Sequence, residues 1–504
     1  MESMRGLSKI ISRIPILFLI FTSLWLRLVN LGYSDYYGDE IKTMWRPAPG
    51  QTTLDYLYAQ KKGPTQFLVT YLVKSIDPSF SNELLLRLPF TLAGILAIYF
   101  FYRLVEINFN KKIAFYATLL LSINGLFVGL MRIAQYQPFV ILFSVLTLYC
   151  FSLALQPKWN RRGIAWGVLF WVAGLLTHYD AIFITPFALY LLLRWYKNNA
   201  GQPVRFYIRH LLLPFALGGA VLGLYFIPYF LTIPGSTTHY WVDRLTNEGD
   251  TTGKLSSSIG NYLLYNPLVG LPVYLIFGVL ALSKIKRLYP LLLWLIFPWI
   301  ILEVFIYEPG THIYNYLIPG IMLVASGLEV MEDFWRKIAG GLWGSRINIA
   351  WLTLLFATLA GISHLIFVDH TPEYPFEERR IAFWTIGGGS PEILLWPYGF
   401  PYYRRWEDIR AYVASMEGNG FYYSNEEVPI SGYYAPFNHS AKNAGIYIYI
   451  YYPQTFDRRE LSEKAHYWRT RYEPVKVFKY GEKLVAEIYL MPAGGLGEIK
   501  SEGY

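Results

Sequence analysis

The chain has 504 residues, of which 54% are hydrophobic and only 16% are charged. Soluble domains carry about 25% charged residues. Because mean hydropathy is also positive (+0.29), the composition excludes an ordinary soluble protein and indicates a polytopic membrane protein with a polar appendage. The net charge of +9 does not indicate nucleic-acid binding, since much of the basic excess lies in alternate loops, and the single cysteine, Cys150, excludes an intrachain disulfide.

The N-terminus carries three basic residues before an apolar run that ends near Val29. This run is long for a signal peptide, and no small-x-small cleavage site follows it, so we interpret it as a retained anchor. Similar apolar stretches recur to about residue 368. We predict about eleven membrane-spanning helices: 10–30, 88–105, 113–131, 138–155, 163–176, 180–196, 211–232, 266–283, 287–307, 313–330 and 348–368.

Every second loop between these spans is basic. The positive-inside rule therefore places the N-terminus and the basic loops in the cytoplasm, and 31–87, 233–265 and the tail after 368 outside. One wrongly assigned helix would break this alternation from that point on. The basic residues are Arg5, Lys9, Arg13, Arg103, Lys111, Lys112, Lys158, Arg161, Arg162, Arg194, Lys197, Arg205, Arg209, Lys284, Lys286, Arg287, Arg336, Lys337 and Arg346.

The first outer loop contains an acidic pair, Asp39 and Glu40, just after the first span. A carboxylate fixed at a membrane surface can act as a general base for an acceptor hydroxyl. The structural alternative is helix capping, because acidic residues often occupy the first turn of a helix. The clustering of other polar residues in the outer loops favours the functional interpretation.

Lys61 and Lys62 follow in the same loop, ahead of Gly63 and Pro64. Either lysine can hold a phosphate as a point charge, and contact with lipid headgroups is the alternative. The segment Pro64–Ile76 is too short to span a bilayer, and we predict an amphipathic helix lying along the interface.

Two arginines lie at the outer ends of predicted spans. Arg87 is expected to pair with Glu83 or with a loop carboxylate, because an unpaired arginine near a membrane is costly. Arg132 is a basic residue at the outer end of a span, where the positive-inside rule disfavours one. This placement favours a phosphate or carboxylate partner.

The remaining candidates lie in short outer turns. His178 and Tyr179 occupy one turn and His312 another, while Tyr136 follows Arg132. The histidines can bind a metal or a sugar, but neither segment has metal-ligand spacing, so ordinary hydrogen bonding is the better interpretation. Most tyrosines are expected in interface belts, and some can stack on sugars.

The tail from 369 to 504 has the pattern of a small soluble α/β domain. Helical spacing runs from Trp406 to about Met416, and strand-like runs cover Tyr447–Tyr452 and Leu484–Met491. We therefore divide the chain into a transmembrane domain, 1–368, and an extracytoplasmic domain, 369–504.

Several short motifs in this order resemble the GT-C superfamily of membrane glycosyltransferases. The pattern is most similar to the family 39 group of dolichyl-phosphate-mannose protein mannosyltransferases and the aminoarabinose lipid A transferases. The motifs are Arg27-Leu28-Val29-Asn30-Leu31-Gly32 before Asp39-Glu40, Gly63-Pro64, Arg87-Leu88-Pro89, Arg132-Ile133-Ala134-Gln135-Tyr136 and Thr177-His178-Tyr179.

Two positions depart from the family pattern. Lys62-Gly63-Pro64 stands where a His-Pro-Pro type segment is common, and Gln135 stands where a second basic residue is frequent. We hypothesise that Lys62 replaces the missing polar group. The Trp-Trp-Asp signature of oligosaccharyltransferases is absent, since Tyr240–Asp243 is not a convincing substitute.

The resemblance implies a plasma-membrane enzyme that moves a hexose or pentose from a polyprenyl-phosphate donor to a hydroxyl of a protein, lipid or glycan on the outer face. Asp39 would be the base, with Glu40 as its neighbour or alternate. Lys61, Lys62, Arg87 and Arg132, with Tyr136, His178, Tyr179 and His312, would bind substrate. Cations near the phosphate could replace a divalent metal, so we predict no metal and no cofactor.

Two other functional classes stay open at this point. A lipid or polysaccharide transporter usually places ionisable residues near the bilayer midplane, whereas the spans here are nearly free of charge. A non-catalytic scaffold of the same fold is the third possibility.

Overall fold

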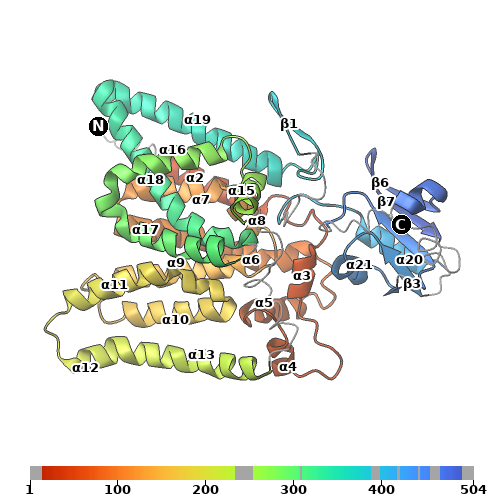
Figure 1. Cartoon of the computed structure of the whole chain (residues 1–504), viewed down its shortest axis with the longest axis horizontal. Helices are drawn as coiled ribbons and strands as arrows, with labels where there is room; N and C mark the ends of the chain where they lie inside the picture. The colour runs from red at the N-terminus through yellow and green to blue at the C-terminus, as the bar shows by residue number, and fades with distance from the viewer. Residues whose placement is uncertain are drawn as a thin grey trace, which may run out of the picture.

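The computed structural model has a helical part and a smaller sheet-containing part, with α3 and α5 between them (Figure 1). It describes residues 14–232, 254–306, 309–387, 398–416, 420–440, 443–454 and 466–490. The segment Tyr240–Asp243 of the predicted outer loop lies outside these residues.

The helices up to residue 367 form the larger part. Their bounds are α2 (Ile14–Leu28), α3 (Gly38–Thr43), α4 (Thr53–Tyr58), α5 (Thr65–Lys74), α6 (Glu83–Asn108), α7 (Lys111–Ile123), α8 (Gly125–Leu130), α9 (Gln137–Ala154), α10 (Gly163–Thr177), α11 (Thr185–Asn198), α12 (Val204–Tyr207), α13 (Leu213–Thr232), α15 (Lys254–Tyr265), α16 (Gly270–Ala281), α17 (Ile285–Ile300), α18 (Tyr314–Ile338) and α19 (Gly341–Phe367). Short 3₁₀ or π segments join some of them: η1 (Tyr179–Ile184), η2 (Ile208–Leu212), η3 (Leu282–Lys284), η4 (Ile301–Phe305) and η5 (Gly310–Ile313).

Each predicted span overlaps a helix of this part. Among the described residues, six helical segments are long and apolar enough to cross a membrane, and shorter apolar helices cover Ile16–Leu28 and Gly163–Thr177. One of the six, Gly270–Phe305, joins two of the predicted spans in a single 36-residue segment. The chain is therefore a multi-pass membrane protein, while the count of eleven stays a prediction.

Asparagine side chains fix where several helices begin. Asn82 accepts a hydrogen bond from the backbone N–H of Leu85 at 3.0 Å, and Asn110 accepts one from Ile113 at 2.9 Å. Such caps satisfy backbone donors that the first turn of a helix leaves unpaired. Local polar residues thus set the start of α6 and α7, although their apolar interiors determine their burial.

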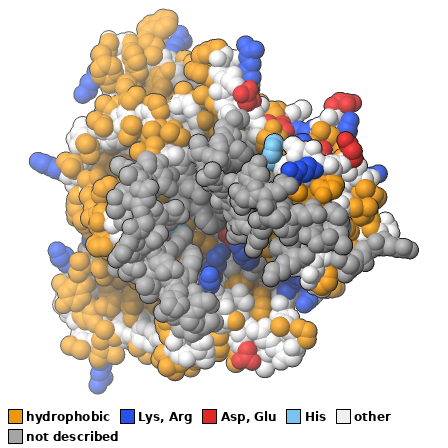
Figure 2. Space-filling model, turned by 45° about the vertical axis from the view of Figure 1, so that its right-hand side comes forward, with side chains coloured by type: hydrophobic (Ala, Val, Ile, Leu, Met, Phe, Trp, Pro, Cys, Tyr) orange, Lys and Arg blue, Asp and Glu red, His pale blue; other side chains and the backbone are white. Residues whose placement is uncertain are grey.

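Large apolar side chains cover much of the outer surface of the helices. On α13, Leu217, Leu224 and Leu231 recur every seven residues and are 60–81% exposed. Figure 2 shows the same character across the helical side of the molecule, where apolar side chains predominate. An apolar surface of this extent requires a lipid environment rather than water.

The predicted interfacial helix is present as α5. Phe67 and Val73 are buried, whereas Leu68, Tyr71 and Leu72 are exposed. A short helix with a buried apolar face and an exposed apolar face suits a position at the membrane surface.

The C-terminal part contains a five-stranded mixed sheet of order β4-β3-β5-β7-β6. β3 pairs in parallel with β4 and β5, whereas β7 pairs antiparallel with β5 and β6. The predicted helix and the two predicted strands are confirmed as α20, β5 and β7. The bounds are β3 (Phe421–Ser424), β4 (Asn438–His439), β5 (Ile446–Ile450), β6 (Lys476–Tyr480), β7 (Lys483–Leu490), α20 (Trp406–Ala414) and α21 (Val428–Tyr434), with a separate hairpin of β1 (Arg379–Ile381) and β2 (Trp384–Ile386).

The sheet shares a hydrophobic core with the first outer loop. Tyr36, Ile41 and Phe67 pack in one buried cluster with Trp406 and Ile448. Burying these side chains together removes apolar surface from water on both sides of the junction. The sheet and the outer loop therefore form one packed unit above the helices.

Polar contacts strengthen the same junction. The backbone N–H of Arg404 donates to Asp35 at 2.6 Å, and the Asp35 N–H donates to the carbonyl of Tyr402 at 2.8 Å. The Arg404 guanidinium is buried and pairs with Glu373. Removing either ionic partner would leave a buried charge unpaired, which is costly.

Two glycines of α18 provide a matched stability test of helix packing. A Cβ at Gly327 would lie 1.9 Å from the carbonyl oxygen of Phe277 in α16, whereas a Cβ at Gly320 would meet only Leu295 at 3.8 Å. We expect Gly327→Ala to destabilise the fold by about 1–3 kcal/mol and to lower the apparent melting temperature in detergent. Gly320→Ala should be neutral or slightly stabilising, and equal melting temperatures for the two variants would contradict this close approach.

Candidate active site

A cavity of about 430 Å³ opens where the outer loop, the helix ends and the C-terminal part meet. Seven of the ten residues predicted from the sequence line it, and the other three lie elsewhere. Those seven are Asp39, Lys61, Lys62, Tyr136, His178, Tyr179 and His312.

Asp39 projects from α3 to the cavity wall, where its side chain is 21% exposed. Lys42 lies 3.2 Å from one carboxylate oxygen, and the Tyr398 hydroxyl donates to the other. Burial opposes its charge, but Lys62, Lys42 and the Tyr398 hydrogen bond hold the pKa of Asp39 below its usual value of 3.8. The group is thus an ionised carboxylate at neutral pH that reaches the cavity.

Glu40, the next residue, faces away from the cavity and is fully buried. Arg87 donates to both carboxylate oxygens at 2.8 Å, and the backbone N–H groups of Tyr37 and Ala134 donate to them at 3.0 and 2.9 Å. The bond from Tyr37 is a helix-capping interaction, which was the structural alternative for the acidic pair. Four donors leave this carboxylate little capacity to take a proton from a substrate.

Arg132 also lies outside the cavity lining. Its guanidinium donates to the carbonyls of Leu26, Val29 and Asn30, at 2.9, 2.9 and 3.2 Å. These carbonyls lie at and just beyond the C-terminal end of α2, where a cation is favourable. The expected phosphate or carboxylate partner is not among these contacts.

Lys62 lies deep in the site because the chain approaches α10 closely at the next residue. A Cβ at Gly63 would come within 2.0 Å of the carbonyl oxygen of Leu176, so a larger residue would displace the loop. Lys62 Nζ donates to Gln135 Oε1 at 2.9 Å and lies 4.8 Å from the centre of the Tyr136 ring. The two positions that depart from the family pattern therefore contact each other.

Aromatic rings continue this stack. The ring of His178 stacks on Tyr136 with centroids 3.9 Å apart and an interplanar angle of 12°. Burial lowers the pKa of His178 to about 4, so the imidazole is neutral near pH 7. Flat rings beside cations suit a ligand that has both a sugar face and a phosphate.

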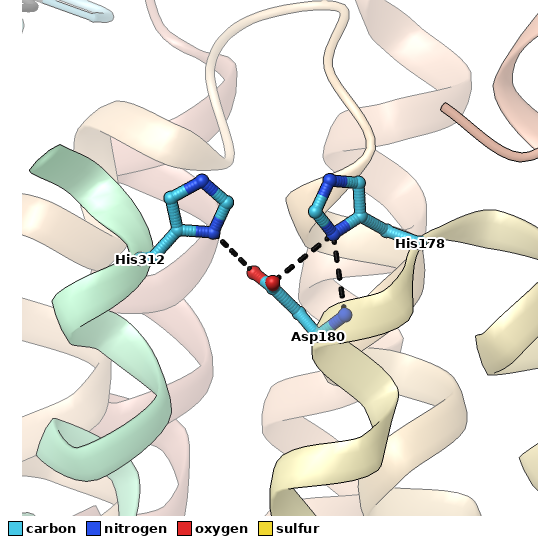
Figure 3. Close-up of side chains that lie close together, drawn as sticks. All are labelled: His178, Asp180 and His312. Atoms are coloured by element: carbon cyan, nitrogen blue, oxygen red, sulfur yellow. Dashed lines mark hydrogen bonds and ion pairs between the residues drawn. The ribbon is translucent and has the colours of Figure 1, made fainter. Parts of the chain in front are cut away.

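His312 and His178, distant in sequence, approach the same carboxylate. Asp180 lies between the two histidines (Figure 3), with His312 Nδ1 2.7 Å and His178 Nδ1 3.1 Å from its oxygens. The sequence places Asp180 directly after the His178 turn, but it was not among the predicted site residues. A carboxylate at the start of an apolar span was the signal that could have identified it.

The sequence analysis also missed two cavity residues that contact Asp39. Lys42 follows the acidic pair by one helical turn, so its position could have been inferred from helical spacing. Tyr398 comes from the C-terminal part, 359 residues away from Asp39. Only the tertiary structure brings it to the site.

Part of the sequence and the fold resemble known proteins. Residues 61–217 match the family model described as dolichyl-phosphate-mannose-protein mannosyltransferase. ArnT from Cupriavidus metallidurans, crystallised with undecaprenyl phosphate, has a similar fold, with a TM-score of 0.51 and 14% identity over 96% of this chain and 98% of that one. Residues 61–217 are therefore similar to this mannosyltransferase family, and the chain as a whole shares the fold of ArnT.

Two weaker likenesses accompany this match. An oligosaccharyltransferase from Archaeoglobus fulgidus, tethered to an acceptor peptide, gives a TM-score of 0.48 at 12% identity, covering 93% of this chain and 73% of that one. The mycobacterial arabinofuranosyltransferase AftD gives 0.46 at 11% identity, covering 95% of this chain and 39% of that one. No curated protein matches by sequence.

Two arginines of α6 form ion pairs that differ in burial. Arg87→Ala would leave Glu40 buried without its partner, which we expect to cost about 3–5 kcal/mol. Arg103, whose side chain is 45% exposed, pairs with Glu106 at 3.4 Å, and Arg103→Ala should cost about 0–1 kcal/mol. Thermal unfolding in one detergent compares them, and an unchanged midpoint for Arg87→Ala would refute the structural importance of the pair.

Proposed function

We propose that this protein is a GT-C enzyme that transfers a sugar from a polyprenyl-phosphate donor to a hydroxyl acceptor at the outer face of the membrane. The observation that carries the proposal is the ionised Asp39 on the wall of a cavity that also contains Lys62 and aromatic rings. The family match supports glycosyl transfer from a lipid-linked donor. A transporter is not favoured, because the charges gather at this cavity beside the helix ends.

Asp39 is the general base in this proposal. It accepts the proton of the acceptor hydroxyl as that oxygen forms a bond to the anomeric carbon. The bond from this carbon to the phosphate oxygen breaks, and the polyprenyl phosphate leaves with both electrons. A carboxylate already ionised at neutral pH is ready to take this proton.

Glu40 has a positioning role. Its bonds to Arg87 and to the backbone of Tyr37 and Ala134 fix the first turn of α3, which carries Asp39. Reacting groups must be held within a fraction of an ångström of their working geometry. The acidic pair thus divides into one reacting and one supporting carboxylate.

Lys62 is the proposed main contact of the leaving phosphate. Lys61 and Lys42 also line the cavity and add positive charge. Ammonium groups stabilise the charge that grows on the phosphate oxygen as the bond breaks. Gln135 in place of a second basic residue avoids like-charge repulsion with Lys62 and accepts its hydrogen bond instead.

The proposed topology has eleven spans, with the N-terminus in the cytoplasm and residues 369–504 outside. In this arrangement the cavity faces the outer side, where the first outer loop and the C-terminal domain meet. The tail closes over the site through Tyr398, whose hydroxyl bonds Asp39. The choice of sugar and of acceptor depends on which substrate groups enter this cavity.

Asp39→Asn should abolish transfer while the fold is retained. The amide has a similar shape but cannot accept the acceptor proton, and loss of such a base usually costs about 10²–10⁴-fold in rate. The assay uses purified protein in lipid with a panel of labelled polyprenyl-phosphate sugars and membrane or cell-wall acceptors. Asp55→Asn, at the exposed start of α4, is the matched control. Undiminished transfer by Asp39→Asn would contradict the assignment of the base.

Lys62→Ala tests the phosphate contact and the electrostatics together. Loss of the ammonium should raise KM for the donor. It should also raise the pKa of Asp39, because Lys62 is the largest influence that lowers it. Since the base works as the anion, the acid limb of the kcat/KM profile should move to higher pH.

Lys61→Ala is the companion variant, because Lys61 lines the same cavity but is not among the groups that lower the pKa of Asp39. Its acid limb should stay in place. A Lys62→Ala enzyme with unchanged donor KM and an unmoved acid limb would show that Lys62 does not replace the family's missing polar group.

A further inference from the structure

His178, Asp180 and His312 form a three-residue cluster at the edge of the cavity. His178 ends α10, Asp180 lies in η1, and His312 belongs to η5 just before α18. One potential ligand atom from each residue lies within 4.8 Å of the others. Figure 3 shows both imidazole rings turned toward the one carboxylate.

The two oxygens of Asp180 have different surroundings. Oδ2 accepts from Tyr314 OH at 2.8 Å and from Asn315 Nδ2 at 3.2 Å, and it lies 2.7 Å from His312 Nδ1. Oδ1 is buried and has no hydrogen-bond partner among the described residues. A buried carboxylate oxygen without a donor is costly and calls for a specific explanation.

The nearest nitrogen does not supply that donor. His178 Nδ1 lies 3.1 Å from Oδ1, but it accepts a hydrogen bond from the backbone N–H of Asp180 at 3.2 Å. In this tautomer Nδ1 carries a lone pair, so two electron-rich atoms face each other. A cation between them would satisfy Oδ1 and would take the lone pair of Nδ1 in place of the backbone N–H.

We propose that His178 Nδ1, Asp180 Oδ1 and His312 Nδ1 bind a divalent metal ion of the zinc class. Two imidazoles and one carboxylate form a common ligand set for such ions, which leaves a fourth position open. A tetrahedral ion with bonds of about 2.0–2.1 Å would separate its ligands by about 3.3 Å. The 3.1 Å between His178 Nδ1 and Asp180 Oδ1 is close to this separation.

Hydrogen bonds and ring stacking from neighbouring residues already hold the proposed ligands in place. Tyr314 and Asn315 fix the carboxylate through Oδ2, which leaves Oδ1 beside His178. Tyr136 stacks on the His178 ring. Such supporting groups orient ligands and commonly change metal affinity by about 10–100-fold.

The ion would join the end of α10 to the start of α18. Both histidines also line the cavity that contains Asp39 and Lys62, so the open position would face the substrate. This consequence rests on the proposed function, with the donor phosphate as the group near the ion. Metal binding itself does not depend on it, and it reverses the sequence-based expectation of metal independence.

The test is direct metal binding by the full-length protein in detergent, with any affinity tag removed because histidine tags bind zinc. After treatment with a chelator, Zn²⁺ is titrated by calorimetry, and bound metal is counted by elemental analysis. Co²⁺ is the spectroscopic probe, since its visible absorption reports tetrahedral coordination. We expect one ion per chain in the wild type.

His312→Ala and His178→Ala should each weaken Zn²⁺ binding on the order of 100-fold or more, because each loses a ligand. His364→Ala is the control, since this ring contacts Trp25 away from the cluster. Zinc should raise the apparent melting temperature of the wild type and the control only. Absence of stoichiometric binding to the wild type, or affinity unchanged in both ligand variants, would overturn the proposal, whether or not the protein transfers sugar.

Discussion

The buried ion pair between Arg87 and Glu40 is the contact on which the rest of the site depends. Both side chains are almost completely shielded from solvent, and two hydrogen bonds of 2.8 Å join them. Arg87 also donates to the carbonyls of Leu31, Ser34 and Asp35, so it gathers the loop that follows α2 onto α6. A buried charge pair of this kind is retained only with nearly complete hydrogen bonding, and here that bonding fixes the backbone ahead of Asp39.

The neighbouring carboxylates show how one step along a helix separates two environments. Asp39 and Glu40 have the same charge and adjacent positions, but successive residues of a helix point about 100° apart. One therefore reaches the cavity and the other the protein interior. Lys42 and Lys62 compensate the charge of Asp39 from the cavity side, whereas Arg87 compensates that of Glu40 from inside. The two carboxylates thus have separate sets of cationic partners.

Sequence analysis predicted the spans, α5, α20, β5 and β7, because the apolar residues of each segment recur with a helical or strand period. It also found seven of the seventeen residues that line the cavity, since loops at the same end of a helical bundle collect together. It anticipated a loop carboxylate as a partner of Arg87, and Glu40 is that partner, but it did not find the partners of Arg132. Arg132 meets three carbonyls at the end of α2, and no local pattern encodes such a contact between distant segments. Tyr398 was missed for the same reason, and Asp180 because it was counted as part of an apolar span.

The boundary at residue 368 divides the sequence into an apolar and a polar part, but residues from both sides of it line the cavity. Tyr398, Phe400 and Tyr402 follow that boundary, yet they pack in the same hydrophobic cluster as the helices. Tyr36 and Ile41 precede it, yet they pack with the sheet. Burial and the neighbouring Asp39 charge raise the pKa of Tyr398 well above 10, so its hydroxyl keeps its proton and can donate to Asp39. The polar tail therefore supplies part of the cavity, and its apolar contacts with the loop 31–87 hold that part in register with the helices.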